Sequence, residues 1–164
     1  MKYLVLALFI AVASADFLPQ TANDRRIFIE SWNTFKQNEV QIVYTVFKAN
    51  PEIQDKFPQF AGKDIDSIKD TDAFAAHAGR VIGFVSEITA LLGDEENNRP
   101  ALRALINKFG TNHKERKISK ELFEKFLDSL DNYPTDQFNW DNNTKRIFSI
   151  GLHNIFHYLI HAST

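Results

Sequence analysis

The chain has 164 residues, a formal net charge of −2, 44% hydrophobic residues and 15 phenylalanines. This length suits one domain with a substantial core, and the mild acidity without a basic cluster argues against nucleic-acid binding. The absence of cysteine excludes disulfides and every thiolate-based metal site, so histidine, aspartate and glutamate are the strong metal ligands left.

The first fifteen residues are predicted to be a secretory signal peptide. Lys2 supplies a positive start, residues 3–12 form an unbroken apolar run, and Ala13-Ser14-Ala15 fits a small-x-small cleavage site. The run is too short to span a bilayer, and no other segment approaches that length. We therefore expect a signal peptide over 1–15, a mature domain over 16–164, secretion, and no membrane partner; an uncleaved anchor is the alternative.

Apolar residues recur at helical spacing through the mature chain, and no segment alternates as a strand does. Pro51 suits the start of a short helix because its missing N–H costs nothing there, and Pro58 then interrupts the chain. The elements expected in this half are a helix from about residue 23, a helix over 40–48, a helical turn over 51–57 and a polar loop over 62–70.

Four longer helices are predicted in the second half. Asp70 or Thr71 can cap the first of them and Ser119 the third. Residues 93–98 form a charged connection, after which Pro100 suits the first turn of the second, and the last begins near residue 141. The chain is thus predicted to be all-α, with seven to eight helices.

Two histidines are set into the apolar stripes of their own predicted helices, and they form the candidate site. His77 shares its stripe with Phe74, and His113 ends a leucine-rich stripe. The aromatic turn Lys56-Phe57-Pro58-Gln59-Phe60 precedes the first of them. Two inward-facing imidazoles and a phenylalanine wall can clamp a flat, apolar ligand with a metal at its centre.

In this order, these residues resemble the globin family, and most of all the secreted haemoglobins of midge larvae. The resemblance is carried by residues 50–60, where a proline starts a short helix and Phe57 is followed by a second phenylalanine, and by His77 twenty residues later, Val81 one turn on, and His113. The 36 residues from His77 to His113 exceed the interval of most globins, and the surplus is placed near 93–100.

This resemblance implies a globin fold around haem b. It implies that His113 is the proximal ligand of the haem iron, and that His77 either donates a hydrogen bond to bound O2 or is a sixth iron ligand. The other residues expected at the cofactor are Phe57, Phe60, Arg80, Val81 and Phe109, with Arg116 and Lys117 as candidates for its propionates. The structural alternatives are a cationic helix cap at His113, a satisfied core histidine at His77, and solvated arginine and lysine side chains.

The implied function is reversible O2 binding for transport or storage by an extracellular haemoglobin that is not an enzyme. Its partners are O2 and other diatomic gases, and a homodimer is left open. Two rivals are a haem protein with NO dioxygenase or peroxidase-like activity, and a haem-free secreted carrier of small apolar molecules.

Three further motifs lie outside this site. His153, His157 and His161 share one face of the last helix, which favours a surface or interface role over a metal site. Asn142-Asn143-Thr144 is a sequon for N-glycosylation in a secreted chain. Residues 64–70 lack the glycine and the terminal glutamate of a calcium loop, so a solvated loop is expected.

Overall fold

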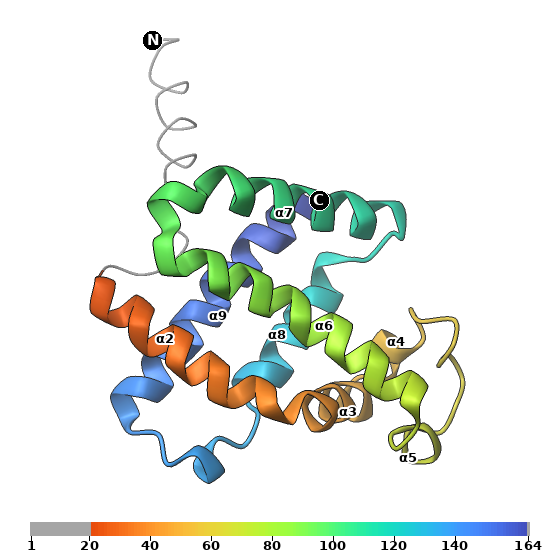
Figure 1. Cartoon of the computed structure of the whole chain (residues 1–164). Coiled ribbons are helices and arrows are strands. Elements are labelled where there is room, and N and C mark those ends of the chain that lie inside the picture. The colour runs from red at the N-terminus through yellow and green to blue at the C-terminus, as the bar shows by residue number, and fades with distance from the viewer. Residues whose placement is uncertain (1–20, 164) are drawn as a thin grey trace, which may run out of the picture.

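The computed structural model describes residues 21–163, so the predicted signal peptide over 1–15 lies outside the described residues. Within residues 21–163 the chain forms eight α-helices and no strand, which confirms the all-α prediction (Figure 1). The helices are α2 (Ala22–Phe35), α3 (Glu39–Ala49), α4 (Pro51–Gln54), α5 (Ile65–Ile68), α6 (Asp72–Leu91), α7 (Glu95–Glu115), α8 (Lys120–Asp131) and α9 (Asn142–Ser163). Short 3-10 turns occupy Lys36–Asn38, Leu92–Asp94 and Asp136–Phe138.

The predicted caps fix where the long helices begin. The Thr71 hydroxyl accepts a hydrogen bond from the backbone N–H of Phe74 at the start of α6 (3.3 Å), and Ser119 caps α8 in the same way through Leu122. Each bond satisfies one of the N–H groups that a helix leaves unpaired in its first turn. The local sequence therefore determines where α6, the helix that carries His77, begins.

Helices α6 and α7 form a hairpin joined by the turn Leu92–Asp94, and α8 and α9 run behind it (Figure 1). Helix α9 packs against α2, α7 and α8. Its approach to α2 is close at Gly151, where a Cβ atom would collide with the Phe28 ring. The buried Trp32 donates a hydrogen bond to Ser86 (3.0 Å) and so joins α2 to α6.

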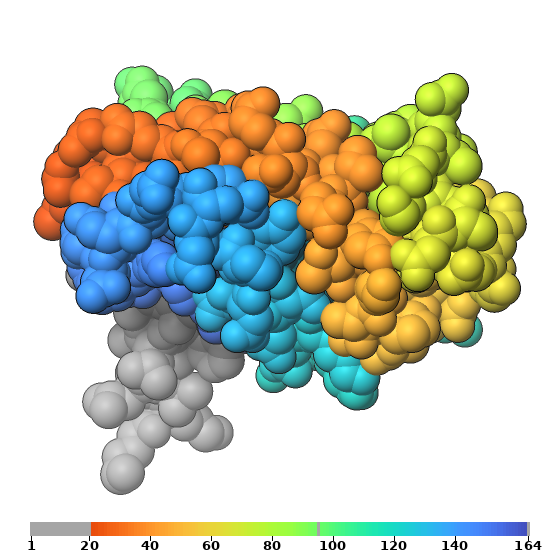
Figure 2. Space-filling model, turned by 90° about the horizontal axis from the view of Figure 1, so that it is seen from below, coloured from red at the N-terminus to blue at the C-terminus, as the bar shows by residue number. Residues whose placement is uncertain are grey.

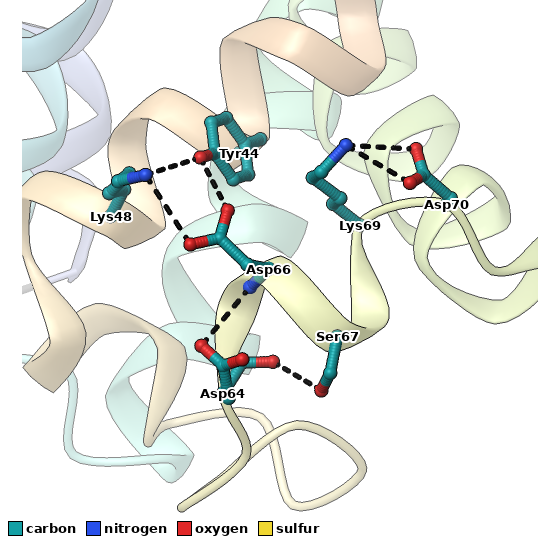
Figure 3. Close-up of polar contacts among 7 residues, drawn as sticks. All are labelled: Tyr44, Lys48, Asp64, Asp66, Ser67, Lys69 and Asp70. Carbon is teal, nitrogen blue, oxygen red and sulfur yellow. Dashed lines mark hydrogen bonds and ion pairs between the residues drawn. The ribbon is translucent and has the colours of Figure 1, made fainter.

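The polar stretch over 62–70, predicted to be a loop, contains the short helix α5. The Asp64 carboxylate caps it by accepting from the N–H of Asp66 (3.3 Å), and Ile68 is buried. Figure 3 shows why the segment is ordered: Asp66 accepts a hydrogen bond from the Tyr44 hydroxyl of α3 (2.7 Å) and pairs with Lys48 (3.4 Å). A single buried isoleucine was too weak a signal to predict this turn.

The predicted connection over 93–98 is mostly helical, because α7 begins at Glu95. Pro100 lies inside α7 rather than in its first turn. The only backbone hydrogen bond lost is the one to the Glu96 carbonyl, and both residues are exposed to water, which can replace it. The surplus residues between His77 and His113 therefore lengthen α7 and form the turn before it.

Seen from below, residues 55–72 form one end of the molecule beyond α3, and the segment between α8 and α9 lies against α2 (Figure 2). Between residues 21 and 163, no helix combines the length and the apolar character needed to cross a membrane.

Candidate functional site

A cavity of about 630 Å³ lies between α6 and α7, and side chains of α8, α9 and residues 53–59 complete it. Its wall is mainly aliphatic and aromatic, with few polar side chains. The apolar lining includes Ile53, Phe57, Val81, Ile82, Phe84, Val85, Phe109, Ile118, Leu122, Phe123, Phe126, Leu130, Phe156 and Leu159, and the polar lining comprises Lys56, Gln59, His77, Arg80, His113 and Arg116. Two imidazoles and three cationic side chains thus border an apolar volume.

His77 lies on α6 inside a group of phenylalanine rings. The ring centroids of Phe57, Phe60 and Phe47 are 4.3, 5.2 and 5.8 Å from that of the imidazole. The side chain is 6% exposed, and its Nε2 is buried without a hydrogen-bond partner among residues 21–163. Burial, assisted by the charge of Arg80, lowers the pKa of His77 to about 4, so the ring is neutral at physiological pH.

His113 lies in the last turn of α7 and lines the same cavity as the residues of α6. Its Nδ1 is 2.8 Å from the carbonyl oxygen of Phe109. Because a carbonyl only accepts, Nδ1 must carry a proton, so in the neutral ring Nε2 has the lone pair that a metal requires. Burial lowers the pKa of His113, although the bond to Phe109 acts in the opposite direction.

The backbone around His113 is fixed by the end of its helix. The N–H of Ile118 donates to the carbonyl of His113 (3.1 Å), and the N–H of Lys117 donates to that of Lys114 (3.0 Å). This pair of bonds is the Schellman arrangement, in which the residue just after the helix takes a left-handed conformation. Lys117 has φ 54°, so a residue other than glycine occupies that position.

Most of the predicted site residues are gathered at this cavity. Phe57, Arg80, Val81 and Phe109 line it together with both histidines, and so does Arg116. Phe60 does not belong to the lining: its ring packs behind His77 and against Phe74, at 5.6 Å between centroids. Lys117 is likewise absent from the lining.

Four phenylalanines lie at the site although none of them belongs to the predicted set. Phe84 stacks on Phe109 at 4.4 Å between centroids, and Phe123 lies 5.3 Å from the His113 ring. Phe126 and Phe156 stack at 5.7 Å and also line the cavity. The apolar stripes of α6, α8 and α9 contain all four, but periodicity identifies an inward face without identifying what that face encloses.

The histidine face of α9 forms no such constellation. His153 lies 3.3 Å from the Asp131 carboxylate, and the rings of His157 and His161 are 4.4 Å apart. Among residues 21–163 no group of three or more histidine, aspartate or glutamate side chains is placed to hold a metal ion. Asn142 of the sequon is exposed at the first residue of α9.

The donor set fits a flat, apolar cofactor with a metal centre and an anionic edge. In its neutral form His113 presents the lone pair of Nε2, and within the described part of the chain the buried Nε2 of His77 has no partner. Such an orphaned polar atom is costly in an apolar wall unless a ligand completes it. Arg80 and Arg116 supply positive charge for carboxylates.

Comparison with known proteins agrees with this geometry. The family model described as "Globin" matches residues 40–159. Globin CTT-VIII of Chironomus thummi thummi is 51% identical over 88% of this chain and 95% of its own, and Globin CTT-II beta of the same organism is 47% identical over 95% and 96%. The crystal structure of a haemoglobin component (TA-VII) from Tokunagayusurika akamusi superposes with a TM-score of 0.75 at 33% identity, over 90% of this chain and 97% of that one. With this fold, this site and these relatives, the chain belongs to the globin family.

Proposed function

We propose that this globin is an extracellular haemoglobin that binds O2 reversibly for transport or storage. Its cofactor is haem, as its family membership implies. The observation that carries the proposal is the pair of imidazoles, His77 and His113, on two helices that border one apolar cavity. When bound, the haem iron supplies a coordination site that takes up and releases O2.

His113 is the proposed proximal ligand. The bond from Nδ1 to the Phe109 carbonyl holds the tautomer and the ring plane, so Nε2 is presented in the ligating form. The Phe109 ring, at 3.7 Å between centroids, packs against the imidazole and limits its rotation. The helix-end bond to its own carbonyl restrains the backbone beneath it.

His77 is the proposed distal residue. Its buried Nε2 lacks a partner among residues 21–163, so a hydrogen bond from it to O2 would satisfy a donor that the protein leaves open. A neutral ring can donate from Nε2, whereas direct coordination of iron would need the lone pair there. The role as a sixth ligand is the alternative, and the gas-binding spectra below distinguish the two.

The other lining residues keep water and polar groups away from the gas. Phe57, Val81 and Phe109 form an apolar enclosure around the two histidines, and exclusion of water protects ferrous haem from oxidation. Arg80 and Arg116 border the same cavity, where guanidinium groups can pair with propionates. We retain both in that role.

The site supports an oxygen carrier over its rivals. The partner of Nδ1 in His113 is a neutral carbonyl rather than a carboxylate, so the ring is not driven toward imidazolate as peroxidase-like chemistry favours. A haem-free carrier of apolar molecules would leave the Nε2 of His77 buried and unpaired. We therefore propose that the chain is not an enzyme.

Secretion is supported by the predicted signal peptide over 1–15 alone. Expression in a secreting host tests it, because the mature protein recovered from the medium should begin near Asp16 by mass spectrometry. Retention of the full-length chain inside the cell would contradict it.

The proposed function is tested by visible absorption spectra of the mature protein in the ferric state, after reduction, and with O2 or CO. We expect a Soret band that shifts on reduction and again with each gas. A bis-histidine spectrum that resists O2 would assign His77 to the iron. A colourless protein that does not take up hemin would overturn the proposal.

The proximal assignment predicts that His113→Ala abolishes or severely weakens haem retention, because the iron loses its only strong protein ligand on that side. The rate of haem transfer to an acceptor apoglobin measures this. His153→Ala, on the exposed face of α9, is the matched control and should retain haem as the unmodified chain does. Equal retention in both variants would show that the proximal ligand lies elsewhere.

A further inference from the structure

Gln54, the last residue of α4, is a buried polar side chain that the proposed function does not use. It is 5% exposed. Its Nε2 donates to the backbone carbonyls of Phe60 (2.9 Å) and Lys63 (2.7 Å), so both amide protons are engaged. A buried amide satisfied by two carbonyls of one segment holds that segment where it lies.

The segment that Gln54 holds is the turn over 55–63, which the chain closes at several points. The Asp55 carboxylate accepts from the N–H of Gly62 (3.1 Å), whose φ of 68° permits the reversal. Within the turn, the N–H of Phe60 donates to the Phe57 carbonyl (2.8 Å). Gln54 is the buried member of this set, and Asp55 is exposed to competing water.

The same turn supplies two of the rings around His77. Phe57 and Phe60 approach its imidazole edge-on, at 4.3 and 5.2 Å between centroids. Since Nε2 of His77 makes no hydrogen bond within residues 21–163, ring packing is what restrains the side chain there. Loss of the turn would release these two rings, whereas Phe47 lies on α3 and would remain.

We propose that Gln54 is a positioning residue for gas binding, which sets the orientation of His77 by holding the turn that carries Phe57 and Phe60. This inference rests on the proposed function, because it assigns the consequence to the distal side of the haem cavity. Gln54 itself does not line the cavity.

The test compares two variants of the haem-loaded chain. Gln54→Met keeps a similar volume and removes both donors. Asn50→Leu is the control: the Asn50 amide also makes two hydrogen bonds, one to the Val46 carbonyl at the end of α3 (3.1 Å) and one to Ser129 of α8 (2.8 Å), and neither involves the turn. Both variants lose hydrogen bonds of the same kind, and only one releases the turn.

Hydrogen exchange by mass spectrometry measures how often the turn opens. The infrared C–O stretch of the CO-loaded protein measures the polar interaction of the His77 imidazole with the bound gas. We expect exchange over residues 57–63 to be about tenfold faster in Gln54→Met. Its C–O band should broaden and move to higher frequency, because His77 no longer holds one orientation. Asn50→Leu should leave both measurements as in the unmodified chain.

Two results would overturn the inference: equal behaviour of the two variants, or faster exchange of the turn with an unchanged C–O band. If Gln54→Met does not fold, Gln54→Glu replaces it, since a protonated carboxyl keeps one donor and an ionised one keeps none. Its band should then move upward in frequency as pH rises, and a pH-independent band would contradict the proposal. Absence of haem from the unmodified chain would instead refute the proposed function, while exchange in the full chain still tests the hold of Gln54 on the turn.

Discussion

His77 and His113 are both buried imidazoles, and their nearest atoms give them different chemistry. The Phe109 carbonyl accepts from Nδ1 of His113, so its Nε2 is the nitrogen available to the proposed iron. Around His77 the neighbours are mostly phenylalanine rings, which offer no strong acceptor and leave Nε2 unpaired within residues 21–163. At the scale of single residues, the partner of each nitrogen thus distinguishes the two imidazoles and supports the different roles proposed for them.

The low pKa of His77 makes stability depend on pH in a defined window. Burial lowers that pKa from 6.5 to about 4, so between these values the unfolded chain binds a proton that the native chain does not. The contribution of neutral His77 to the free energy of unfolding is therefore complete above pH 6.5, and it decreases as the pH falls toward 4. His77→Leu should remove this part of the dependence, as measured by urea unfolding at pH 7, 6, 5 and 4.5. A slope equal to that of the unmodified chain would contradict the assignment.

At the scale of elements, helix ends and short segments hold the histidine helices in place. Thr71 fixes the start of α6, and the Schellman bonds fix the end of α7 just below His113. The second of these requires a left-handed residue, and the chain uses Lys117 there. The fold therefore retains a small conformational cost four residues after the proposed proximal ligand.

Lys117→Gly should stabilise the protein by about 1 kcal/mol, because glycine adopts φ 54° without the steric cost that a lysine carries. Chemical unfolding of the loaded chain gives the difference. Asn139 has φ 52° in a comparable conformation, but asparagine tolerates it, so Asn139→Gly should gain less. Equal gains at the two sites would show that the side-chain type is not what carries the cost.

The link between α3 and α5 in Figure 3 should weaken in acid. The hydrogen bond from Tyr44 is the largest cause of the lowered pKa of Asp66, and the positive charge of Lys48 lowers this pKa further. A carboxyl whose pKa is lower in the native chain stabilises the native state at pH values above 3.8, its pKa in the unfolded chain. This stabilisation is lost as the pH falls through the native pKa. Tyr44→Phe should therefore reduce stability modestly at pH 7, with a smaller reduction near pH 3. Unfolding in urea at both pH values checks this, and a reduction that does not shrink in acid would count against it.

At the scale of the whole molecule, the contact between α7 and α9 connects the helix of His113 to the last helix. Gly110, three residues before His113, lies so close to α9 that an added Cβ would collide with the backbone of Ala162. Residues far apart in sequence, on α7 and α9, thus set the position of α7. No local pattern indicates that this glycine is required.

Gly110→Ala should destabilise the protein by about 1–3 kcal/mol and accelerate haem loss, because α7 must move away from α9. Gly83→Ala on α6 is the matched control. Its Cβ would meet nothing within 4 Å, so it should stabilise the helix by about 0.5–1 kcal/mol. Thermal unfolding and haem transfer rates measure both effects, and a neutral Gly110→Ala would show that the contact relaxes freely.

Helical periodicity predicts the fold class, and capping residues predict where α6 and α8 begin, because both signals act over one or two turns. The sequence predicts part of the cavity lining, but not the phenylalanines of α8 and α9. It also placed His77 and His113 on inward faces, as the structure shows. Three features appear only in the folded chain: Phe60 packs behind His77, α7 extends through Pro100, and Gln54 holds the turn over 55–63. These features depend on which surfaces meet across the fold, and a period of 3.6 residues carries no information about the neighbour that a buried face will find.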